Sequence, residues 1–437
     1  MKKIYCLEIL LFVLSPLYTQ AQDEGIKLDI YEIESKVLEK SKQIKLEEHK
    51  LKAKESMIND AQNSLYPDLS INGSIDKVSN FLIYDNGLFK KASKHDVIHT
   101  LYSTNTNLYL NIYEGLKTKN SIKLRKLEAE LQRERLTQQQ AFVKLQAFHL
   151  FLDLYLQKEW EKLMITDIED KEHQLKEIQD LHELGIVLQS DVLRSELELS
   201  KRKITLIEIQ NEQKKINQQL NVLIGLNDEQ KIKPVFDIET LPLNESFNDV
   251  LKTSISKSYE ERLSSIEVAI TEKNYDLIKA NNTIKIGMGG SFQFSNPQIF
   301  LYPYNDSWYN LGTIGLKASY SFSELYKNKN KKRVAEIEIE ESHEHHKKIQ
   351  DEIRTKIYQD YLSLDEAVKY VSFYKLNKEY ALENARILKD AYFNQTALIT
   401  DLLDADVLVL KSVFELKQSK INVFKNYYKL QYSKGTL

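Results

Sequence analysis

The sequence predicts a mainly α-helical protein with a small β part, in which long antiparallel coiled-coil helices accompany four strands of transmembrane length. Backbone breakers are scarce: the 437 residues include only 12 glycines and 6 prolines, so helices are expected to run long. Four short stretches alternate between apolar and polar residues, which is the period of a strand. The formal net charge is −3, and the overall balance of basic and acidic residues argues against a nucleic-acid partner.

Residues 1–21 have the composition of a secretory signal peptide. Lys2 and Lys3 precede an apolar run from Ile9 to Leu14, and Thr19-Gln20-Ala21 resembles a small-x-small cleavage site. A short buried helix is the alternative. The sequence therefore predicts export from the cytoplasm.

Cysteine usage and hydropathy restrict the mature chain further. Cys6 is the only cysteine and lies ahead of the apolar run, so disulfides, cysteine zinc sites and a lipidated N-terminus are excluded. No segment reaches the roughly 20 consecutive apolar residues that a membrane-spanning helix needs. If the protein is in a membrane, it must cross by strands.

The chain runs twice through the order helix, strand, strand, long helix, helix. The first pass is predicted at about Leu28–Ser64, Tyr66–Ile75, Thr106–Tyr113 and onward from Leu116; the second is predicted at about Phe247–Ala280, Ile284–Phe294, Thr313–Phe322 and onward from Glu324. Gly73-Ser74 and Gly290-Ser291 correspond, as do Asp191-Val192-Leu193 and Asp401-Leu402-Leu403. A spacing near 210 indicates a duplication, with chance resemblance between heptads as the alternative. We therefore expect a first repeat at 22–225, a linker at 226–246 and a second repeat at 247–437.

The four strands each have one apolar and one polar face. The apolar set is Leu69, Ile71, Ile75, Leu108, Leu110, Ile112, Ile284, Ile286, Met288, Phe292, Phe294, Ile314, Leu316, Ala318, Tyr320 and Phe322. This alternation suits a transmembrane barrel, but a soluble half-buried sheet has it as well. Four strands cannot close a barrel, for which about eight are the minimum, so a membrane sheet would require several chains to pool their strands.

A long helix is predicted from about Leu116 to Leu184, and it would span on the order of 100 Å. Apolar residues step by three and four along it and along the matching helix of the second repeat, which is coiled-coil spacing; examples are Leu145, Phe148, Leu152 and Ile349, Ile353, Ile357. No globular core is that deep, so we expect extended coiled coils.

The order of elements, the duplication and four motifs resemble the TolC family of outer-membrane efflux proteins over essentially the whole mature chain. The motifs are LYPDLSINGS (65–74), LYLNIYEG (108–115), LGIVLQSDVLRSE (184–196) and TDLLDAD (400–406). The resemblance implies a homotrimer, with a twelve-stranded barrel in outer-membrane lipid on a periplasmic tube of twelve α-helices. It also implies an exit duct that receives solutes from an inner-membrane RND or ABC transporter through a periplasmic adaptor, the membrane fusion protein.

The resemblance further implies a gate near the tip of the second coiled coil. Asp401 and Asp404 match the family's acidic run there, and threefold symmetry would gather six carboxylates into a ring suited to cations. The alternative is that both are ordinary first-turn acids, favoured by the helix dipole.

Residues that tie neighbouring coils in the closed state of the family match Ser190, Asp191 and Tyr392. Gly185 is expected to form a left-handed turn at one coil tip, and its counterpart in the repeat is Gln395. Two positions depart from the family: Ala397 stands where a basic partner is expected, and Ile284 stands where the first repeat has Pro67.

Other chemistry is poorly supported by the sequence. His343 and His346 share a helical face and could bind a metal, but a solvated stretch of coil is the preferred interpretation. No nucleophile and base combination stands out, so we expect neither an enzyme nor a cofactor. The alternatives to an efflux duct are a periplasmic coiled-coil scaffold or adhesin, and a pore without a pump partner.

Overall fold

The computed structural model describes residues 25–242, 245–297 and 305–437, so the predicted signal peptide lies outside the described residues. The chain divides into two compact units. Unit 1 is formed by the chain up to residue 41 together with 146–242 and 366–425, and unit 2 is formed by 42–145, 243–365 and 426–437. Each unit draws on both halves of the sequence, so the units and the predicted repeats divide the chain differently.

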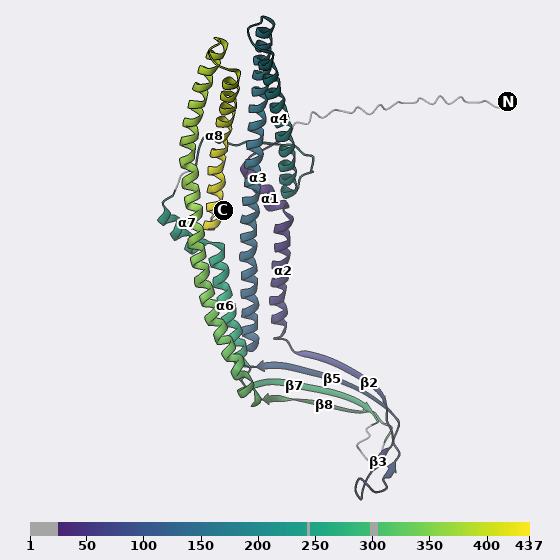
Figure 1. The fold of residues 1–437 in the computed structure, drawn as a ribbon. Coiled ribbons are helices and arrows are strands. Elements are labelled where there is room, and N and C mark those ends of the chain that lie inside the picture. The colour runs from purple at the N-terminus through teal and green to yellow at the C-terminus, as the bar shows by residue number, and fades with distance from the viewer. Residues whose placement is uncertain (1–24, 243–244, 298–304) are drawn as a thin grey trace, which may run out of the picture. The chain divides into compact units, whose positions relative to one another are not determined.

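Unit 2 contains one four-stranded antiparallel sheet in the order β2-β5-β7-β8 (Figure 1). Its strands are β2 (Asp68–Lys77), β5 (Thr100–Tyr113), β7 (Lys285–Asn296) and β8 (Tyr309–Ser319). The four predicted strands are confirmed with shifted ends, and Ile284, Tyr320 and Phe322 lie outside them. The loop between β2 and β5 holds a small hairpin, β3 (Phe81–Ile83) and β4 (Ser93–His95), that was not predicted.

The helices of unit 2 are α2 (Lys42–Asn63), α5 (Phe247–Lys257), α6 (Tyr259–Ala280), the first part of α3 (Lys117–Glu183) and the first part of α7 (Ser323–Phe393). Helices α3 and α7 have 67 and 71 residues, which confirms the predicted long helices. The predicted helix 247–280 is broken at Ser258. This serine ends α5 and caps α6, because its hydroxyl accepts a hydrogen bond from the Glu261 backbone N–H.

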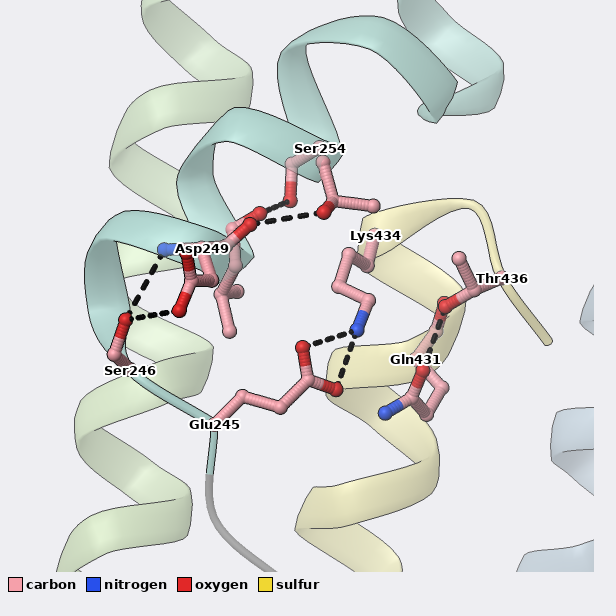
Figure 2. A network of polar contacts seen from close by, with 9 residues as sticks. Glu245, Ser246, Asp249, Ser254, Gln431, Lys434 and Thr436 are labelled. Atoms are coloured by element: carbon pink, nitrogen blue, oxygen red, sulfur yellow. Dashed lines mark hydrogen bonds and ion pairs between the residues drawn. The ribbon is translucent and has the colours of Figure 1, made fainter.

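The last turn of α8 (Ile399–Lys434) is fixed against α5 in unit 2 (Figure 2). The Lys434 ammonium is almost fully buried and donates to both carboxylate oxygens of Glu245, at 2.7 and 2.9 Å. Gly435 follows with φ +75°, and a Cβ there would lie 2.0 Å from the Lys257 carbonyl oxygen. Only glycine fits this close approach.

Unit 1 contains two helical hairpins. The first joins the remainder of α3 to α4 (Gln189–Ile224), and the second joins the remainder of α7 to α8 (Figure 1). The core consists of side chains from all four helices, among them Phe151, Leu154 and Met164 of α3, Leu220 of α4, Tyr392 of α7, and Leu402 and Ile421 of α8. The predicted coiled-coil spacing therefore corresponds to packed helix faces.

Unit 1 also contains two short strands that were not predicted. Strands β1 (Ile26–Leu28) and β6 (Ile232–Pro234) pair in parallel, and α1 (Ile30–Lys40) follows β1 with a capping box between Asp29 and Glu32. The segment 226–246, predicted as a linker, therefore contributes to the structure. Its Phe236 ring packs against Phe151 at 6.0 Å and against Phe424 at 4.7 Å between ring centroids.

No helix among the described residues is both long and apolar enough to cross a membrane. In the His343–His346 stretch, the first three residues are exposed as predicted and His346 is half-buried, with its Nδ1 2.8 Å from the Ser264 hydroxyl and its Nε2 3.1 Å from the Gln350 amide. His346 therefore serves as a packing contact between α6 and α7.

Candidate functional site

The sheet of unit 2 separates apolar from polar side chains, as the alternation predicts. Residues that are partners across the strands point to the same face. One row aligns Leu69, Leu108, Gly290 and Ile314, and the next row aligns Ser70, Asn107, Ser291 and Thr313. Hydroxyl contacts tie the polar rows, for example Ser291 to Thr313 at 2.7 Å. Ile112 was predicted on the apolar face, but a register shift between Asn111 and Tyr113 interrupts the alternation at this residue.

The apolar face of this sheet is uncovered in the single chain. Ile71, Ile314 and Leu316 are 69%, 76% and 75% exposed, and β2 and β8 are edge strands. Water is a poor solvent for such a face, and open edges are sites of pairing with further strands. The sheet is thus suited to an apolar surrounding and to neighbours at both edges.

The tips of the two hairpins in unit 1 have the same backbone form. Gly185 has φ +74° and Gln395 has φ +62°, both left-handed. The amide of Ile186 donates to the Leu181 carbonyl at 2.9 Å, and the amide of Thr396 donates to the Ala391 carbonyl at 2.8 Å. The predicted turns lie at these positions, and the second has a glutamine in a conformation that usually favours glycine.

Asp401 and Asp404 lie in the first turns of α8, and both are exposed. They differ in their contacts. The Asp401 carboxylate accepts a hydrogen bond from the Leu398 amide at 3.3 Å, which is the local role of a helix-start acid. Among the described residues, the Asp404 side chain makes no hydrogen bond or ion pair, so its exposed carboxylate is available to another ligand.

The predicted tie residues lie next to one another where the two hairpins pack. Tyr392 is buried in a cluster with Ile178, Val192, Ile399 and Leu402. Burial and the nearby Asp191 carboxylate raise the pKa of the Tyr392 hydroxyl, and this hydroxyl has no hydrogen-bond partner among the described residues. The Ser190 hydroxyl donates to the Asp191 carboxylate at 3.4 Å. The structure therefore brings Asp191 and Tyr392 together without a direct hydrogen bond.

A buried charged layer between the hairpins was not predicted. Lys171 of α3 forms an ion pair with Asp406 of α8, and their side chains are 12% and 18% exposed. Gln174 accepts from Lys171 at 2.9 Å and donates to Asp406 at 3.4 Å. Beside them Arg202 of α4 pairs with Asp167 at 3.0 Å. Burial raises the pKa of the Asp167 carboxyl, against the opposing effects of Arg202 and Lys171.

The sequence contains a pattern that predicts this layer, because charged residues occupy core positions of the coiled coil. Met164, Ile168, Lys171, Leu175 and Ile178 step by four and three along α3, so Lys171 occupies a core position of the coiled coil. Asp406 likewise falls between Leu402 and Leu410 on α8, both buried. A charge in the core of each of two helices predicts that the charges pair with each other.

The arrangement defines a class of protein: two coiled-coil hairpins, with a four-stranded sheet that exposes an apolar face and two edges. Solved outer-membrane channels have this fold. The outer-membrane channel OprN matches with a TM-score of 0.77 at 13% identity, covering 93% of this chain and 90% of that chain. The outer membrane protein VceC of Vibrio cholerae matches with a TM-score of 0.75 at 12% identity, covering 93% and 96%.

A third match is the open state of the MtrE outer membrane channel of Neisseria gonorrhoeae, with a TM-score of 0.73 at 12% identity, covering 93% of this chain and 88% of that chain. No family model matches the sequence, and no curated protein matches it. The chain has the fold of these outer-membrane channels along nearly its whole length.

Proposed function

We propose that this protein is the outer-membrane exit duct of a tripartite export system, and that it acts as a homotrimer. In this proposal, solutes reach the duct from an inner-membrane RND or ABC transporter through a periplasmic adaptor. The observation that carries the proposal is the sheet of unit 2, with its exposed apolar face and two open edges. The fold shared with outer-membrane channels supports it.

The edges explain why several chains are needed. In lipid, an unpaired strand edge leaves backbone N–H and C=O groups without water, so sheets in membranes close into barrels. In this proposal, β2 of one protomer pairs with β8 of the next. Three protomers would supply twelve strands, which exceeds the minimum of about eight for a closed barrel.

The polar face of the sheet is then the wall of the duct. Its residues are mostly small and neutral, such as Ser70, Asn107, Ser291 and Thr313. Such a wall holds water and makes few specific contacts, so the duct itself does no chemistry. The hairpins of unit 1 are the proposed periplasmic part, and they offer the surface for the adaptor.

We place the gate of the duct at the hairpins of unit 1. Asp401 and Asp404 are the proposed cation-binding ring, with Asp404 as the freer ligand. The contacts that hold one hairpin against the other are proposed to keep the gate closed, and these are Tyr392 with its apolar cluster and the Lys171–Asp406 pair. In this proposal the second contact replaces the tie that Ala397 does not supply.

Conductance in planar bilayers tests the duct directly. The mature protein should co-fractionate with outer membranes and, after reconstitution, produce discrete single-channel currents. Protein heated to complete denaturation before reconstitution is the control. A protein that remains in the soluble periplasmic fraction and gives no currents would instead be the scaffold or adhesin.

A further inference from the structure

The junction between β5 and α3 carries a stripe of exposed side chains that changes from apolar to cationic. Ile112 and Leu116 are 56% and 57% exposed, and Lys119 and Lys123 follow on the same side of the helix, each exposed. Leu116 has φ +66°, a left-handed conformation that is rare for leucine. Among the described residues, Leu116 is therefore both strained and more than half exposed.

The same stripe recurs at the junction between β8 and α7, at a spacing of 210 residues. Phe322 corresponds to Ile112, Tyr326 to Leu116, Lys329 to Lys119 and Arg333 to Lys123. All four are exposed, Phe322 by 74% and Tyr326 by 69%. A surface feature that is kept at both junctions indicates a shared environment.

The charge at these junctions is concentrated and largely unpaired. Residues 117–126 and 327–333 each contain five basic residues and no acidic one, a local excess that the balance of the whole chain conceals. Among the described residues, Lys119, Lys123 and Lys329 make no ion pair, and Arg333 has one exposed contact, with Glu336 at 3.7 Å. Lys119 lies in the first turn of α3, where a cation opposes the helix dipole, and a bound external anion would offset this repulsion.

We propose that these two stripes form a collar that binds the headgroups of anionic phospholipids. The collar consists of Ile112, Leu116, Lys119 and Lys123 together with Phe322, Tyr326, Lys329 and Arg333. It rests on the proposed function, because it requires the sheet to lie in a bilayer. Its apolar members continue the exposed apolar face of the sheet into the acyl boundary, and its cations reach the phosphates beyond that boundary.

The order and spacing along each helix fit this ligand. Lys329 and Arg333 follow Tyr326 by three and seven positions within α7, which corresponds to about 5 and 10 Å along the helix axis, and Lys119 and Lys123 follow Leu116 by the same numbers of positions. The polar headgroup region on one side of a bilayer is about 5–8 Å thick. A lipid interface favours aromatic and aliphatic side chains at the inner boundary of this region, with lysine and arginine farther out.

Lipid retention tests the collar. The mature protein is purified in detergent micelles that contain equal amounts of phosphatidylglycerol and phosphatidylcholine, and the retained lipids are quantified by mass spectrometry. Each cation next to an anionic surface contributes a factor of about five. The parent protein should therefore enrich phosphatidylglycerol at least about fivefold, and K119Q/K123Q/K329Q/R333Q should return close to the input ratio.

A matched control removes the same charge from unit 1, at exposed lysines without ion pairs among the described residues, in the variant K176Q/K214Q/K375Q/K389Q. This variant should retain the enrichment of phosphatidylglycerol. An excess of soluble glycerol phosphate should leave the enrichment in the parent protein in place, whereas it would abolish enrichment at a site that binds free anions. The collar is refuted if the parent shows no enrichment of phosphatidylglycerol, which is the result expected if an acidic protein covers the stripes. It is also refuted if the collar variant and the control variant retain phosphatidylglycerol to the same extent. Currents from the same preparations in planar bilayers would show whether the duct itself has failed.

Discussion

Removing Lys171 should destabilise the packing of the hairpins far more than removing the whole Lys171–Asp406 pair. In Lys171→Met, the Asp406 carboxylate, which is 18% exposed, loses its cation and keeps only the hydrogen bond from Gln174 among the described contacts. Asp167 then retains Arg202 as its cation but loses the attraction of Lys171, while Asp406 still repels it. Breaking a buried pair costs about 3–5 kcal/mol. Because both side chains retain some solvent contact, we expect a loss of about 3 kcal/mol.

Removing the partner, Asp406, is expected to lower the free energy of unfolding less than removing Lys171. In Asp406→Leu, the Lys171 ammonium can turn toward Asp167, whose pKa is raised by burial and which Lys171 already attracts. We expect a loss of about 1–2 kcal/mol for this variant. In the double variant, methionine and leucine continue the apolar layers formed by Ile168 and Leu410, so the net change should stay within about 1 kcal/mol of the parent.

The assay is denaturant unfolding of the detergent-solubilised protein, followed by the helical circular dichroism signal at pH 7. The three variants and the parent form a double-mutant cycle, which isolates the coupling between the two side chains. Opposite-face Lys176→Met is the control for loss of a lysine alone, since that side chain is exposed. Additive losses in the double variant would refute the interpretation of the pair as a buried, coupled layer.

Three further predictions concern other parts of the molecule. Leu316→Arg should cost about 2–4 kcal/mol if that face meets lipid, whereas Ser319→Arg on the polar face should be tolerated; equal thermal stability of the two in detergent would favour a soluble sheet. In planar bilayers, divalent or trivalent cations added on the hairpin side should block the parent channel and block D401A/D404A much less, and identical block would leave both aspartates as helix-start acids. Burial, with Glu260 and Tyr259 nearby, raises the pKa of Tyr432 to about 12 from an ordinary value of 10. The stability that the neutral Tyr432 hydroxyl contributes is therefore fully present below pH 10 and is lost as the pH rises toward 12. The parent should therefore lose about 2 kcal/mol of stability over that interval that Tyr432→Phe does not lose, measured by alkaline unfolding curves.

Much of the fold follows from local sequence. The scarcity of glycine and proline predicts both ends of α3 and the start of α7 within a residue or two, because nothing inside these helices favours a break. Alternation predicts which strand residues share a face, because the side-chain period of a strand is fixed at two. The breaks at Ser41 and Ser258 were missed, although Ser258 with Glu261 three residues later is a helix-start combination.

The parts that sequence reasoning missed depend on distant partners. Strands β1 and β6 have three residues each, which is too short for an alternating pattern to be recognised, and they pair across some 200 positions of the sequence. Lys171 is recognisable as a charge in a coiled-coil core, but Asp406 becomes its partner only when the two hairpins pack. The same holds for Phe236, whose aromatic neighbours come from α3 and α8.

The native mass of the mature protein in detergent tests most directly whether several chains pool their strands to form the duct. Because β2 and β8 leave two open edges on every chain, a stable assembly must close them. Light scattering coupled to size exclusion, corrected for bound detergent, should give three chains per particle. A stable particle of one or two chains would contradict the proposed duct.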